Sequence, residues 1–133
     1  MMVLVALMLL QGDPLTAGDL VYSGSRLLLE NRVVGRELEI KWACYATHDT
    51  VEIVAARYEK DARLTPGTWR QPTGERGFQS KADPELHVAI FPAEDLPRHS
   101  PCHAKLEGGE QTVLQVSHGL RRHPTGQTDA AGK

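Results

Sequence analysis

The chain has 133 residues, which is the length of a single domain built around one hydrophobic core. Apolar residues make up 41% and charged residues 24%, and the net charge is −2 with both signs scattered along the chain. This balance is ordinary for a soluble protein and lacks the basic stripe with interleaved aromatic residues of nucleic-acid-binding proteins, so we expect no nucleic-acid partner.

The N-terminal segment, residues 1–18, opens with an uncharged and mostly apolar run that ends at Gln11. The run is too short to cross a bilayer, which takes about 20 residues, so we expect no membrane span. Its length matches the apolar part of a signal peptide, and Thr16 and Gly18 are the best small pair for cleavage before Asp19. The alternative is an apolar arm that packs on the folded protein.

Strand patterns dominate from there onward. Residues 20–23 and 26–31 flank Gly24 and predict an edge segment with a bulge or a bend. In residues 38–46, LEIKWACYA, apolar side chains alternate with mostly polar ones, which predicts a strand whose apolar face carries Cys44 inward.

Further strands are expected along the middle of the chain. Residues 51–59, VEIVAARYE, follow the turn-prone sequence THDT and are predicted to form a strand with both faces covered. Residues 60–85 are rich in Gly, Pro and charge, which predicts a long loop system with one weak strand around Trp69. The run LHVAIF at 86–91 predicts another strand.

The last two predicted strands form a hairpin. Residues 102–107 and 111–119 are joined through Gly108 and Gly109. A three-residue loop gives the register that buries the apolar side chains. In that register Cys102 points inward, as Cys44 does.

The two cysteines, Cys44 and Cys102, are therefore both expected on inward faces. This favours a disulfide, which would stabilise the fold by about 4 kcal/mol through loop closure and would require an oxidising compartment. Two separate buried thiols, or a metal or catalytic role, are the alternatives. His99 and His103 lie near Cys102 in sequence, but a zinc site would need a second ligand pair with matching spacing, so we expect no metal.

The pattern resembles an immunoglobulin-like domain over residues 33–119. The residues that carry the resemblance are the strand with Cys44, the aromatic Tyr58, the run LHVAIFPAED ending at Asp95, and Cys102 before a terminal hairpin. The resemblance implies a mainly β, antiparallel two-sheet sandwich with one inter-sheet disulfide. It implies recognition or assembly as a function only by analogy.

The remaining motifs bear on catalysis and on partner binding. The chain carries no Gly-x-Ser-x-Gly turn and no phosphate-binding glycine loop, so we expect neither enzyme activity nor a cofactor. Trp69, Arg70, Arg76 and Phe78 lie in the long loop, where exposed aromatic and arginine side chains would anchor a partner. Alternatively, the two aromatic rings plug one end of the sandwich.

We therefore expect an apolar arm or signal/anchor segment at 1–18, a β-sandwich domain at 19–120 and a flexible polar tail at 121–133. The predicted function is a non-catalytic structural or assembly subunit of an extracellular particle, such as a phage virion or surface filament, with identical or neighbouring subunits as partners. The alternative is a secreted immunoglobulin-like module that binds a protein or glycan through residues 63–82. The expected location is extracellular, virion or periplasmic.

Overall fold

The computed structural model describes residues 15–67 and 76–121. In chain order the elements are η1 (Ala17–Leu20), β1 (Arg26–Val34), β2 (Leu38–Thr47), α2 (Val51–Glu59), β3 (Leu64–Pro66), β4 (Arg76–Ser80), β5 (Leu86–Pro92), η2 (Ala93–Asp95), η3 (His103–Lys105) and β6 (Thr112–Arg121). Most of the predicted arm and nearly all of the predicted tail lie outside the described residues. Leu15 and Ala17 already pack against the core, so the folded part includes the end of the segment predicted as an arm.

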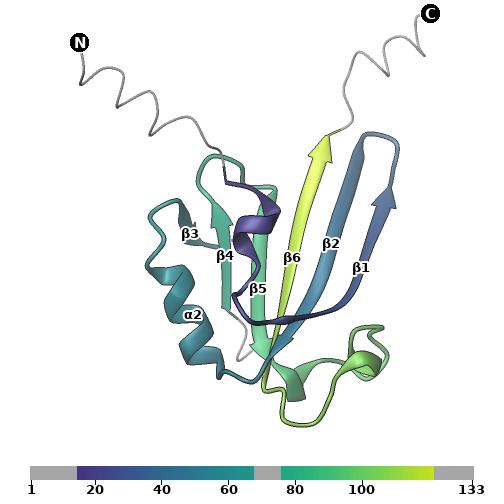
Figure 1. Cartoon of the computed structure of the whole chain (residues 1–133). Coiled ribbons are helices and arrows are strands. Elements are labelled where there is room, and N and C mark those ends of the chain that lie inside the picture. Colours follow the sequence, from purple (N-terminus) through teal and green to yellow (C-terminus); the bar gives the residue numbers. More distant parts are fainter. Residues whose placement is uncertain (1–14, 68–75, 122–133) are drawn as a thin grey trace, which may run out of the picture.

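The strands form one antiparallel sheet in the order β1-β2-β6-β5-β4-β3 (Figure 1). The mainly β, antiparallel prediction is confirmed, and so are the strands at 26–31, 38–46 and 86–91. The predicted sandwich needs a second sheet, and the strands of the described residues make only one. The layers on its two faces are helices and an irregular segment instead.

The segment predicted as a strand at 51–59 is the helix α2, so that prediction was wrong. Thr50 caps its N-terminus, because the threonine side chain accepts the backbone N–H of Ile53 at 3.3 Å. The buried residues recur at the three- and four-residue spacing of one helix face, which satisfies the apolar side chains as well as a strand would. These residues are Val51, Val54, Ala55 and Tyr58.

Helix α2 and η1 cover one face of the sheet over β5, and η1 also covers β6 (Figure 1). Tyr58 joins the two covering elements, because its hydroxyl donates to the Leu20 carbonyl oxygen. Its ring also stacks on Phe78 with centroids 5.9 Å apart. Both Tyr58 and Leu20 are almost fully buried, so this face holds the larger core cluster.

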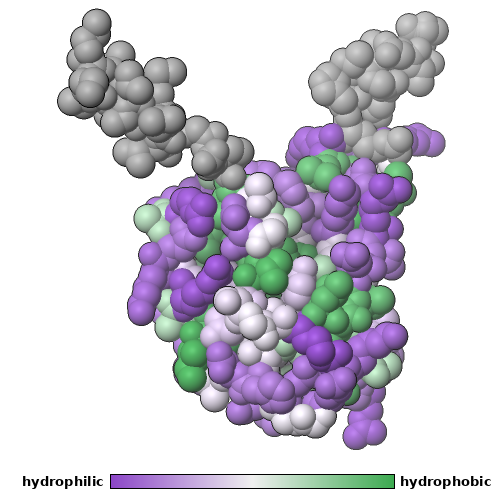
Figure 2. Space-filling model, viewed as in Figure 1, coloured by the Kyte–Doolittle hydropathy of each residue, from purple (hydrophilic) through white to green (hydrophobic). Residues whose placement is uncertain are grey.

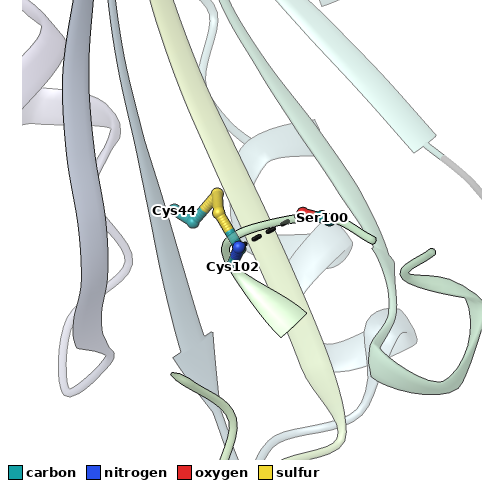
Figure 3. The surroundings of a disulfide bond; sticks show 3 residues. All are labelled: Cys44, Ser100 and Cys102. Carbon is teal, nitrogen blue, oxygen red and sulfur yellow. Dashed lines mark hydrogen bonds between the residues drawn. A yellow bond between two sulfur atoms is a disulfide. The ribbon is translucent and has the colours of Figure 1, made fainter. Parts of the chain in front are cut away.

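Residues 93–111 cover part of the opposite face, and the Cys44–Cys102 disulfide fastens them to β2 (Figure 3). Both cysteines are 1% exposed and lie in a second core cluster with Leu28, Ala46, Leu96 and Val113. The disulfide prediction is thus confirmed. The bond joins the sheet to a covering segment, whereas the prediction had it join two sheets.

The predicted strand at 102–107 and its hairpin with 111–119 are wrong. Ser100 accepts the backbone N–H of Cys102 at 3.2 Å, and Cys102 has helical backbone angles before the short η3. A Ser-Pro sequence immediately before the cysteine favours such a turn over a strand. The strand β6 pairs instead with β2 and β5, which come from distant parts of the chain.

The disulfide should contribute a large part of the net stability. Its cysteines are 58 residues apart in sequence, so reduction, or the double substitution Cys44→Ala with Cys102→Ala, should lower the free energy of unfolding by about 4 kcal/mol. Urea unfolding of the oxidised and reduced protein measures this difference. As a control, the protein is denatured without reduction and treated with an alkylating reagent, and its intact mass should not change. An increase in mass that corresponds to alkylation of both cysteines would show that the disulfide is absent.

Candidate functional site

The two edges of the sheet differ in length and in chemistry. Strand β3 has three residues and ends at Pro66, which has no N–H to offer a further strand. Strand β1 has nine residues, and within the described part of the chain it pairs only with β2. The open side of β1 is therefore the longer edge, as Figure 1 shows at the outer margin of the sheet.

The backbone of β1 presents alternate residues to this open side. The Gly35 N–H donates to the Leu38 carbonyl at 2.8 Å, which closes a two-residue turn between β1 and β2. Hydrogen-bonded pairs alternate along an antiparallel ladder, so the even-numbered residues within 30–34 point their N–H and C=O groups away from β2. In agreement, the Arg32 N–H donates at 2.7 Å to the side-chain Oδ1 of its neighbour Asn31.

Aliphatic side chains lie exposed along the same strand. Val33 is 54% exposed, Val34 is 52% exposed and Leu27 is 46% exposed. A bulge between Leu27 and Leu29 disturbs the start of the strand, as predicted for the edge segment, while the pairing with β2 continues regularly to Val34. The regular part of this edge strand thus carries two valine side chains that are exposed to solvent.

Charged side chains share one face of β1. Glu30 and Arg32 are both exposed and two residues apart, so they lie on the same face. Arg32 Nε lies 3.2 Å from Glu39 Oε2 in an ion pair, although the geometry is not that of a hydrogen bond. No ion pair within the described residues involves Glu30.

A groove of about 500 Å³ lies beside this edge, between η1 and the strands β1 and β2. Its apolar lining includes Ala17, Val21, Trp42, Ala43, Tyr45 and Val116. Glu30, Arg32 and Lys41 supply its charges. Figure 2 shows apolar side chains gathered on this face among hydrophilic ones. Burial, and to a smaller extent the Glu30 charge, raises the pKa of Tyr45, so its phenol stays neutral at pH 7.

Arg26 holds the start of β1 against the segment that covers the second face. Its guanidinium donates to both carboxylate oxygens of Glu110 at 3.0 and 2.9 Å and to the Lys105 carbonyl at 2.8 Å. The Glu110 side chain is only 3% exposed, and the hydrogen bond from Arg26 lowers its pKa. A bidentate pair of this kind fixes both position and direction, so it orients the edge strand.

Two of the four residues predicted to bind a partner, Arg76 and Phe78, belong to the described part of the chain, and one is on the surface while the other is in the core. Trp69 and Arg70 lie outside the described residues. Arg76 begins β4 on the surface, with its Nη1 3.9 Å from Glu59 Oε2. Phe78 is 6% exposed and belongs to the core, in agreement with the packing alternative. The prediction overlooked the edge of β1, for which the sequence feature is the pair Val33-Val34 immediately before a Gly-containing turn.

No protein-family model, curated protein or solved structure matches the chain. Among residues 15–67 and 76–121, no helix is long and apolar enough to cross a membrane. The same residues contain no group of three or more His, Cys, Asp or Glu side chains arranged to hold a metal ion.

The ion pair between Arg26 and Glu110 should contribute to the free energy of unfolding in a pH-dependent way. Because folding lowers the Glu110 pKa from its usual value of 4.5, its contribution is present above that pH and is lost as the pH falls. Glu110→Gln should therefore lower the free energy of unfolding by about 2 kcal/mol at pH 7 and by less at pH 3. Urea unfolding at both pH values measures the change.

Glu107→Gln is the matched control for this prediction. The Glu107 side chain is 70% exposed and 3.8 Å from Arg26, so its loss should change stability very little. Equal losses for the two variants, or a Glu110→Gln loss that is the same at both pH values, would contradict the assignment.

Proposed function

We propose that this protein is a non-catalytic assembly subunit that joins protein partners through the open edge of β1. In this proposal it belongs to an extracellular particle, such as a phage virion or a surface filament. The observation that carries the proposal is the nine-residue edge strand, on which Val33 and Val34 are more than half exposed.

An open edge strand binds other chains by adding a strand to the sheet. Backbone hydrogen bonds supply affinity in this mode, and the side chains on alternate faces supply specificity. Natural proteins commonly protect such edges with short strands, charged side chains, Pro or bulges. Strand β3 is protected in this way by its length and by Pro66. Strand β1 contains neither Lys nor Pro, its bulge lies before the regular stretch 30–34, and its charged residues Glu30 and Arg32 are of opposite sign, which supports a docking role for its edge.

The disulfide supports the extracellular location that we propose. Cys44 and Cys102 are paired and buried, and structural disulfides persist in oxidising surroundings. A crosslinked small domain is also suited to a particle outside the cell, because it resists unfolding without help from chaperones.

The edge is better supported as the docking surface than the segment 63–82. Within the described part of that segment, Phe78 is packed against Tyr58. Arg76 is near a carboxylate of the same chain. The valines of β1, by contrast, have more than half of their surface available to a partner.

A pair of matched substitutions tests the proposed function. Val34 and Ile53 are 52% and 55% exposed, but Val34 lies on β1 and Ile53 on α2. We expect the wild type and Ile53→Lys, made in the producing cells, to sediment as part of a complex larger than two copies of the 14.7 kDa chain. Val34→Lys should shift the chain to the free position, because a lysine on an edge strand opposes the addition of a further strand.

Gradient sedimentation of the exported material, followed by immunodetection, measures these positions. Wild-type chain at the free position, or a Val34→Lys chain that remains in the complex, would contradict the proposal.

A further inference from the structure

We propose that the partner of the β1 edge is a second copy of this chain, bound antiparallel about a two-fold axis that passes beside Asn31. This inference rests on the proposed function in one respect, namely that β1 is a docking edge. It adds the identity of the partner and the register of the contact. The two six-stranded sheets would then form one continuous sheet across the axis.

The backbone limits the registers that are available. Only the even-numbered residues from Glu30 to Val34 direct their N–H and C=O groups outward, so an even-numbered residue must face an even-numbered residue of the second copy. For two identical antiparallel strands this leaves three central arrangements. The axis passes beside Glu30, beside Asn31 or beside Arg32.

Charge selects among these three arrangements. With the axis at Asn31, each Glu30 lies directly opposite Arg32 of the second copy, which gives two pairs of opposite charge. With the axis at Glu30, the two Glu30 side chains oppose each other, and with the axis at Arg32, the two arginines do. Like charges directly opposite each other destabilise a strand pair, so the strand is self-complementary only about Asn31.

The other face of the strand agrees with this register. The axis at Asn31 places Leu29 opposite Val33 of the second copy, twice, on the face that also carries Trp42. Val33 is 54% exposed in the single chain, and Leu29 and Trp42 are partly buried against the second core cluster. The contact would cover the exposed valine and extend an apolar cluster that already exists.

Asn31 caps the edge in the single chain. Its Oδ1 accepts the Arg32 N–H at 2.7 Å, so this outward donor is not left without a partner before association. In the paired form the Glu30 carbonyl of the second copy takes that N–H, and the two asparagine side chains are released beside the axis. Asn31 therefore competes with association, and its removal should strengthen the contact.

The pairing also changes the groove beside the edge. Glu30 and Arg32 both line it, and a two-fold axis perpendicular to the sheet keeps the two grooves on the same face. Each groove would gain a charge from the other copy, because Glu30 and Arg32 meet across the axis. Only the β1 edges meet, and the short β3 edge ends at Pro66, so this contact closes on a dimer.

Charge exchange tests the proposal on the purified, disulfide-intact full chain. Sedimentation equilibrium should give the wild type a mass twice that of the chain. Glu30→Arg and Arg32→Glu should each weaken the dimer about tenfold or more, because both opposite-charge pairs become like-charge pairs. The double variant, with both substitutions, should regain the dimer. An equimolar mixture of the two single variants should form a heterodimer.

Controls separate this contact from changes within one chain. The double variant also lacks the Arg32–Glu39 ion pair, so its recovery would assign the effect to the contact between copies. Glu59→Arg reverses a charge at the end of α2 and should leave the dimer unchanged. Asn31→Val should tighten the dimer, since it removes the side chain that competes for the Arg32 N–H.

The outcomes distinguish this inference from the proposed function. A purified wild type that stays monomeric would overturn self-pairing, while a Val34-dependent complex in the producing cells would still support assembly with other chains. A dimer that the single charge reversals do not weaken, or that the double variant does not restore, would overturn the register about Asn31. A purified dimer without any larger complex in the producing cells would uphold the self-pairing and contradict the particle subunit.

Discussion

The pairing of β6 with both β2 and β5 is the constraint on which the rest of the structure depends. Without β6 the sheet would separate into the β1–β2 hairpin and the β3–β5 meander. All ten of its residues pair with 38–47 on one side, and residues 112–118 pair with 86–92 on the other. Its side chains enter both core clusters, Leu114 on the helix side and Val113 on the disulfide side. A single strand thus fixes the register of both halves.

The sequence correctly predicted the elements whose hydrophobic pattern matches the burial of their side chains in the fold. The alternation in 38–46 and the apolar run at 86–91 are strands, and Cys44 faces inward as that alternation requires. The segment 51–59 misled because Val, Ile and Tyr favour strands, although Thr50 and the spacing of its buried residues already fitted a capped helix. At 102–107 the alternation was too short to outweigh the turn that Ser100 begins.

The candidate site depends on facts that the sequence does not carry locally. Whether β1 is an edge is decided by β6, which takes the other side of β2. The residues around Gly24 predicted an edge segment with a bulge or a bend, and the bulge lies between Leu27 and Leu29, but the exposure of Val33 and Val34 follows from which strands lie beside them. Phe78 shows the reverse case, since its place in a Gly- and Pro-rich stretch indicated a surface loop and Tyr58 instead holds it in the core.

The position of β6 in the chain also has a consequence for biosynthesis. Ribosomes make β1 to β5 before β6, so a nascent chain lacks the strand that joins the two halves of the sheet until residues 112–121 emerge. During that interval one side of β2 and one side of β5 are open, and Cys44 can meet Cys102 before the sheet is complete. Early crosslinking would then hold residues 93–111 near the site that β6 must enter, so the order of oxidation and strand insertion would govern the yield of folded protein.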